Sequence, residues 1–217
     1  MLSPRARLVL LALATIAIAC LGVAMLARSS HHSDDAAAVV EEVDGSGPKS
    51  PFKGALRPDS APRDFALRNQ DGKLIRTKDL RGRVVVVTPM YTTCRDTCPL
   101  VAQQIRDALR DMDGDQREQI DALAVSVDPS NDSRDSANRF LDTRRVRGYL
   151  DFLIGTEPEL RPVWRSYGFS EQLNRREHNA YVVLVDKLGR QRVGFPVDFL
   201  TSEALAHDLR LLAAESG

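Results

Sequence analysis

The chain has 217 residues, and its 30 basic and 30 acidic side chains leave a formal net charge of zero. It is long enough for one globular domain of ordinary size plus an additional segment, and we find no internal repeat. Because the charges balance, nothing in the composition indicates a nucleic-acid-binding protein.

An apolar segment near the N-terminus predicts a membrane anchor. It runs without a charge from Leu8 to Ala27 and includes Cys20. As a helix it spans about 30 Å, the thickness of a bilayer core. Arg5 and Arg7 precede it and indicate a cytoplasmic N-terminus. We therefore expect residues 1–27 to form a single-pass anchor in the inner (cytoplasmic) membrane, with the rest of the chain on the periplasmic, outer side.

Two other interpretations of this apolar segment remain open. It could be a cleaved signal peptide, although the apolar part of a signal peptide is normally shorter. It could also be cleaved as a lipoprotein before Cys20, although the apolar run continues beyond that cysteine. All three interpretations predict that the remainder of the chain is exported.

Residues 28–60 are expected to form a flexible linker. This stretch contains few large apolar side chains, a Gly-Ser-Gly-Pro sequence and several prolines, so burial cannot offset the entropy lost on ordering it. His31 and His32 lie in it and are expected to be solvated. The folded domain is then expected to occupy residues 61–217.

Within this domain, the order of apolar patterns predicts a thioredoxin-like α/β fold, a central mixed sheet flanked by helices. Strands are expected near Phe65 to Arg68, Leu74 to Thr77, Val84 to Tyr91, Ile120 to Val127 and Leu150 to Ile154. A hairpin should pair Tyr181 to Val185 with Gln191 to Phe195. Helices are expected from Cys98, from Asp132 or Ser133 toward Arg145, from Pro158 to Tyr167, and from Thr201 or Ser202.

The most informative motif is the pair Cys94 and Cys98, directly after the buried strand. Three residues separate the two cysteines, whereas two separate those of a thioredoxin. A spacing of i and i+4 at the start of a helix is expected to place both sulfurs on one helix face, with Cβ atoms roughly 5 to 6 Å apart. Such a pair can share one metal ion or form a disulfide. Asp128 ends the next parallel strand and should gather at the same edge of the sheet.

His178 is the third candidate site residue. It precedes the predicted hairpin, in the loop that a thioredoxin-like chain brings up to its cysteines. In a thioredoxin reductant this loop carries a cis-proline, but no proline lies between Pro162 and Pro196. His207, on the polar side of the last predicted helix, has no comparable argument.

Two thiolates and an imidazole form a soft donor set that suits Cu(I) and can also bind Cu(II). A structural zinc site would normally need a fourth protein ligand, for which only Asp96, Asp128 or water is available. Arg95 and the positive end of the following helix should favour the thiolate form of the cysteines. An incomplete site at a sheet edge is what a delivery protein needs, because a recipient must displace its ligands.

From about residue 60 to 214 the chain resembles the Sco/SenC family of membrane-anchored, thioredoxin-fold proteins. The resemblance rests on an ordered set of pieces: Tyr91-Thr92-Thr93-Cys94 through Cys98-Pro99-Leu100, Ser126-Val127-Asp128-Pro129 followed by Asp132, and His178 ahead of Tyr181 to Asp186 and Gly189. The family's copper ligands, two cysteines and a histidine, fall by position on Cys94, Cys98 and His178. The chain departs from the family where Arg95 replaces a proline and Glu177 replaces an aspartate.

The resemblance implies a copper metallochaperone that delivers copper to the dinuclear centre of cytochrome c oxidase during assembly. Its expected partners are the copper-receiving oxidase subunit and, in addition, other copper chaperones or thioredoxin-like reductants.

The alternative function is a thiol-disulfide oxidoreductase that reduces the recipient's cysteines, with Cys94 as the more exposed nucleophile and Cys98 resolving. The substitution Arg95 could shift the balance toward this chemistry. A peroxidase is a distant third hypothesis, because Pro89 and Thr92 do not match the spacing of a peroxiredoxin.

Overall fold

The four valines at the start of the predicted buried strand lie in β4 (Val84–Met90), a central strand of a mixed sheet. The computed structural model describes residues 50–169 and 181–216, and within these residues the sheet has eight strands in the order β1-β8-β7-β4-β5-β6-β2-β3. β4 runs parallel to β5 and antiparallel to β7, which makes the sheet mixed as predicted. The other strands are β1 (Ala55–Ser60), β2 (Ala66–Asn69), β3 (Leu74–Arg76), β5 (Ile120–Ser126), β6 (Asp151–Ile154), β7 (Tyr181–Val185) and β8 (Gln191–Pro196).

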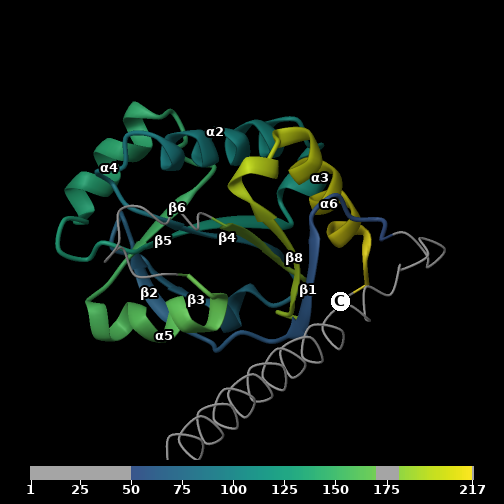
Figure 1. Cartoon of the computed structure of the whole chain (residues 1–217), viewed down its shortest axis with the longest axis horizontal. Coiled ribbons are helices and arrows are strands. Elements are labelled where there is room, and N and C mark those ends of the chain that lie inside the picture. Colours follow the sequence, from purple (N-terminus) through teal and green to yellow (C-terminus); the bar gives the residue numbers. More distant parts are fainter. Residues whose placement is uncertain (1–49, 170–180, 217) are drawn as a thin grey trace, which may run out of the picture. The chain divides into compact units, whose positions relative to one another are not determined.

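Helices cover both faces of this sheet (Figure 1). One face packs against α2 (Thr97–Arg110), α4 (Arg134–Thr143) and α6 (Ser202–Ala214), and the other packs against α5 (Glu157–Tyr167). Short turns of helix complete the described chain: η1 (Thr77–Leu80), α3 (Gly114–Arg117) and η2 (Val197–Phe199).

The alternation of side chains along β4 builds the two cores. Val84 and Val86 pack with α2 and α6, whereas Val85 and Val87 pack with α5, and all four are buried. Apolar residues on both faces of a strand indicate that the sheet is covered on both sides at this point. This explains why a continuous valine run marks the centre of the fold.

The thioredoxin-like order predicted from the sequence is confirmed, with element boundaries shifted by only a few residues. Ser133 rather than Asp132 caps α4, because its hydroxyl accepts a hydrogen bond from the backbone nitrogen of Ser136. Thr201 caps α6 in the same way through the backbone nitrogen of Ala204.

The boundary between linker and domain differs from the expectation. Residues 55–60, predicted to belong to the linker, form β1 and pair antiparallel with β8, and the compact unit begins at Ser50. The backbone N–H groups of Lys53 and Gly54 donate hydrogen bonds to the buried carboxylate of Asp208, at 2.8 and 2.9 Å. Pro58 interrupts any alternation in this edge strand, so its residues carry no strand pattern.

No helix among residues 50–169 and 181–216 is both long enough and apolar enough to cross a bilayer. The predicted anchor from Leu8 to Ala27, with Cys20, lies outside the described residues.

Candidate functional site

The two cysteines lie where β4 gives way to α2. The loop after Met90 carries Cys94, whose backbone nitrogen donates to the carbonyl of Tyr91 at 3.2 Å, and α2 begins only at Thr97. The prediction that both cysteines share a helix face is therefore wrong for Cys94, which precedes the helix. The sulfurs still meet, because the loop folds back over the helix start. Both thiols are free.

Cys94 takes the place of a capping side chain at the start of α2. The N-cap residue, Asp96, makes no side-chain capping bond, whereas the Cys94 sulfur accepts the backbone N–H of Cys98 at 3.3 Å. A negative sulfur at this position is favoured by the unpaired N–H groups and by the helix dipole.

These contacts separate the acidities of the two thiols. Donation from the Cys98 thiol, helped by the backbone N–H groups of Cys98 and Asp96 and the side chain of Tyr91, lowers the pKa of Cys94 to about 5. The pKa of Cys98 is raised, first by this same bond to Cys94 and then by burial. At neutral pH the site therefore holds one thiolate and one thiol.

Exposure does not distinguish the two cysteines. Each residue is 5% exposed, so the exposed fraction does not single out Cys94. Their difference lies in charge: Cys94 is the ionised sulfur and Cys98 is its hydrogen-bond donor.

Asp132 fixes the loop that leads into Cys94. Its Oδ1 accepts the backbone N–H and the hydroxyl of Thr92, both at 2.7 Å, and its Oδ2 accepts the hydroxyl of Ser126 at 2.6 Å. The carbonyl of Ser126 accepts the indole N–H of Trp164 at 2.8 Å. The sequence suggested Asp132 only as a helix cap and as part of a family motif. The signal for this role in the sequence is a spacing: Asp132 comes four residues after Asp128, in the Asp-Pro pair that ends the strand.

Asp132 is buried, and its pKa is raised by desolvation despite the hydrogen bonds from Ser126 and Thr92. Asp128 follows β5 at the same sheet edge, as predicted, since the backbone nitrogen of Val127 donates to Met90. The carboxylate of Asp128 is engaged by its own turn, through Ser130 and Asn131.

The described chain supplies only part of the predicted metal site. Among residues 50–169 and 181–216 no three His, Cys, Asp or Glu side chains are grouped to hold a metal ion. Cys94 and Cys98 are together, and His178 lies outside the described residues. His207 is on α6, where its Nδ1 lies 2.9 Å from the carboxylate of Asp208.

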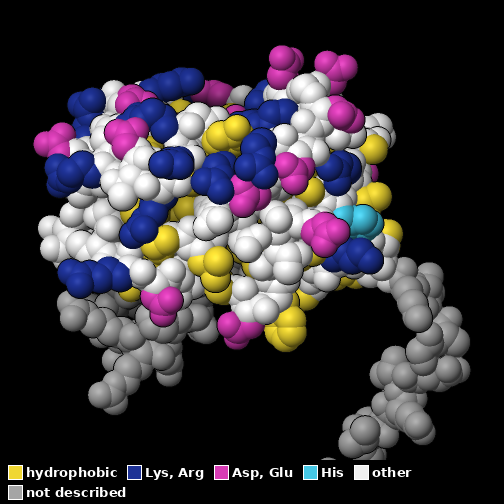
Figure 2. All heavy atoms as spheres, turned by 90° about the horizontal axis from the view of Figure 1, so that it is seen from above, with side chains coloured by type: hydrophobic (Ala, Val, Ile, Leu, Met, Phe, Trp, Pro, Cys, Tyr) yellow, Lys and Arg dark blue, Asp and Glu magenta, His cyan; other side chains and the backbone are white. Residues whose placement is uncertain are grey.

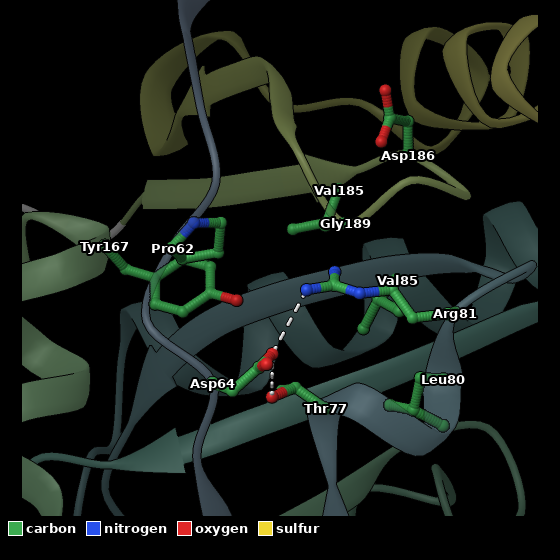
Figure 3. A pocket seen from close by; sticks show the side chains of 10 residues that line it. All are labelled: Pro62, Asp64, Thr77, Leu80, Arg81, Val85, Tyr167, Val185, Asp186 and Gly189. Atoms are coloured by element: carbon green, nitrogen blue, oxygen red, sulfur yellow. Dashed lines mark hydrogen bonds and ion pairs between the residues drawn. The ribbon is translucent and has the colours of Figure 1, made fainter.

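A small pocket at the opposite end of β4 is separate from this site (Figure 3). The guanidinium of Arg81 lies across it and donates to Asp64, and the hydroxyl of Tyr167 points toward Arg81. Its volume of about 20 Å³ holds roughly one water molecule. The pocket contains no cysteine, and we regard it as a packing void.

The fold, with a dithiol at the end of a central strand, defines the chain as a thioredoxin-like α/β protein. Residues 54–214 match the model of the SCO1/SenC family, and the chain belongs to this family.

Known proteins share both its sequence and its fold. A SCO2-like protein of Rickettsia typhi is 21% identical over 152 residues, which cover 65% of this chain and 72% of that protein. The structure of Bradyrhizobium japonicum ScoI with copper bound is similar with a TM-score of 0.60 and 27% identity, over 70% of this chain and 99% of ScoI. BsSco, described as a member of the Sco family of cytochrome c oxidase assembly proteins with a disulfide switch, shares the fold with a TM-score of 0.62 at 20% identity, over 73% of this chain and 96% of BsSco.

Proposed function

We propose that this protein is a membrane-anchored copper metallochaperone that delivers copper to cytochrome c oxidase during its assembly. The observation that carries the proposal is the thiolate of Cys94 held against the thiol of Cys98 at the start of α2. Family membership and the copper bound to ScoI support the same function.

The donor set fits copper as cargo. Sulfur ligands favour Cu(I), and His178 would add an imidazole that also permits Cu(II). Cys94 is ready to bind, since it is already ionised at neutral pH. Cys98 would lose its proton on binding, because a metal ligand must be deprotonated, so loading should release a proton.

Three protein donors leave the copper open to a partner's ligands. We propose that the copper-receiving subunit of cytochrome c oxidase displaces Cys94, Cys98 and His178, and that other copper chaperones or thioredoxin-like reductants load or reduce the site. A four-ligand structural site would resist such exchange.

Metal analysis of the reduced protein tests the ligand assignment. We expect one copper per chain and much weaker binding in Cys94→Ser, Cys98→Ser and His178→Ala, since two donors cannot enforce the same geometry. His207→Ala is the matched control and should bind as the parent does. Unchanged affinity of His178→Ala for both Cu(I) and Cu(II) would remove His178 from the site.

We propose that residues 1–27 anchor the protein in the inner membrane, with the domain on the periplasmic side. The length of the apolar run and the arginines before it support this topology. Protease added to the outer side should cut the domain from a membrane-bound protein. A soluble, N-terminally trimmed form as the major cellular species would overturn the anchor and leave export intact.

The unequal acidities also favour a second function, a thiol-disulfide oxidoreductase. The Cys94 thiolate would attack a disulfide sulfur of the recipient, forming a mixed disulfide and releasing one thiolate. Cys98 would then lose its proton and attack the Cys94 sulfur, releasing the second thiolate. The recipient is thereby reduced, and Cys94 and Cys98 become a disulfide.

A further inference from the structure

A groove adjoins the loop that carries Cys94. It has a volume of about 280 Å³ and is lined by Thr92 and Thr93, directly before Cys94, and by residues of α4 and its C-terminus: Ser136, Arg139, Phe140, Thr143 and Arg144. Phe140 is buried and provides an apolar floor, whereas Arg139 and Arg144 are exposed. The groove thus lies between α4 and the two residues that precede Cys94.

This groove has an uncompensated positive charge. No carboxylate lines it, and neither Arg139 nor Arg144 forms an ion pair within the part of the chain that the structure describes. The acidic residue between them in sequence, Asp142, is instead engaged by Arg147. Figure 2 shows the molecule from above, with Lys and Arg side chains spread over this face among Asp and Glu side chains.

We propose that this groove receives an extended acidic segment of the protein partner whose cysteines meet Cys94. Carboxylates are acceptors only, and they match the guanidinium donors of Arg139 and Arg144 and the exposed hydroxyls of Thr93 and Thr143. The proposal rests on the proposed function, since it assumes that a cysteine-bearing partner approaches Cys94.

The openness of the groove favours a protein segment over a free anion. Both arginines face solvent, where an isolated small anion gains little from an ion pair. A segment linked to a cysteine at Cys94 is different, because attachment raises its effective concentration beside the groove. Charge at such a position acts mainly on the rate of association.

Thiol exchange with charged peptides tests the groove directly. The probes are short peptides with one cysteine activated as a mixed disulfide with thionitrobenzoate, and with aspartates or lysines on either side. The Cys94 thiolate attacks the peptide sulfur, the peptide becomes disulfide-bonded to Cys94, and thionitrobenzoate leaves. We expect the aspartate peptide to react faster than the lysine peptide, and Arg139→Gln/Arg144→Gln to slow the aspartate peptide about five- to tenfold.

Lys78→Gln/Arg165→Gln is the matched control. It also removes two positive charges, but from η1 and from α5 on the other face of the sheet, and it should change the rates less than twofold. If both double variants slow the reaction of the aspartate peptide equally, the effect comes from net charge alone. This result would overturn the proposal that the groove binds the segment. Slowing by phosphate beyond that of chloride at matched ionic strength would indicate a free-anion site and would also overturn the proposal.

A second readout avoids the thiols. Addition of an aspartate peptide without cysteine should shift the amide resonances of Thr93, Arg139 and Arg144 and leave those of α5 unchanged. Copper binding by Arg139→Gln/Arg144→Gln should equal that of the parent. If the aspartate peptide does not bind at the groove, the copper-binding result still stands. If the protein does not bind copper, the peptide result still stands.

Discussion

The Oδ1 atom of Asp132 lies 2.7 Å from both the backbone nitrogen and the hydroxyl of Thr92. Thr92 is two residues before Cys94, and Asp132 follows the neighbouring strand β5. The end of β4 and the end of β5 are thus tied together directly beneath the dithiol. The thiolate is held at the helix start by a loop that is itself held by a buried carboxylate.

We predict that Asp132→Ala destabilises the protein far more than Asp132→Asn. Alanine leaves the N–H of Thr92 and the buried hydroxyl of Ser126 without an acceptor or partner, which should lower the free energy of unfolding by about 2 to 4 kcal/mol. Asparagine keeps an acceptor for Thr92 and should cost about 1 kcal/mol. Urea unfolding of the reduced protein measures both. An alanine variant as stable as the parent would contradict the role of Asp132 in holding the loop.

We predict that each cysteine controls the acidity of the other. In Cys98→Ala the pKa of Cys94 should rise above 5, because the Cys98 thiol is the largest cause of its lowering. In Cys94→Ala the pKa of Cys98 should fall, because the bond to Cys94 is the largest cause of its elevation. Ultraviolet absorbance of the thiolate, followed against pH, checks both variants. A Cys94 pKa unchanged by removal of Cys98 would place the source of its acidity in the backbone N–H groups.

The lowered pKa of Cys94 predicts how stability depends on pH. Between about 5 and its ordinary value of 9.0, Cys94 is ionised in the folded protein and protonated in the unfolded chain. The unfolded state binds more protons in this pH window. The contribution of Cys94 to the free energy of unfolding therefore grows as pH rises toward 9.0 and is lost as pH falls through 5. Comparison of the reduced parent with Cys94→Ser, by denaturant unfolding across this range, should isolate the slope. Parallel curves for the two proteins would refute it.

Gly194 is predicted to be essential for packing in β8. A Cβ atom there would overlap the ring of Tyr181, the first residue of β7. Gly194→Ala should therefore lower the free energy of unfolding by about 1 to 3 kcal/mol. Gly114→Ala, in α3, is the control, since a Cβ there meets open space and should be nearly neutral. Thermal unfolding measures both, and equal stabilities for the two variants would show that the Tyr181 ring moves aside freely.

We predict that the substitution His178→Ala distinguishes the two candidate functions, because copper binding uses an imidazole and dithiol exchange does not. In cells that lack the native gene and are limited for copper, His178→Ala should lose oxidase activity as fully as the double cysteine variant. Added copper should restore part of it. If cells with His178→Ala keep oxidase activity while cells with Cys94→Ser lose it, the result would instead support the oxidoreductase function.

The sequence predicted the core of this fold well, because buried strands and amphipathic helices leave strong periodic signals. Val84 to Val87 marked the central strand, and the apolar stripe from Val101 to Leu109 marked α2. β1 escaped notice because an edge strand with Pro58 has neither alternation nor a long apolar run, and its pairing with β8 depends on contacts distant in sequence.

The sequence predicted that the two cysteines lie close together, but not their local geometry. Spacing alone indicated that Cys94 and Cys98 lie close together, yet it could not reveal that α2 starts at Thr97. The role of Asp132 depends on a tertiary contact between two loops, which no local pattern encodes. His178 stays a prediction, since it lies outside the described residues.

Trp164 is the only tryptophan of the chain, and a short series of hydrogen bonds links its indole to the loop that precedes Cys94. The indole N–H binds the carbonyl of Ser126, whose hydroxyl binds Asp132, which in turn holds Thr92. Any rearrangement of that loop upon metal loading or oxidation alters the polarity and hydrogen bonding around a single, buried fluorophore. We therefore expect the intrinsic emission of Trp164 to report on the state of the cysteines without an attached dye.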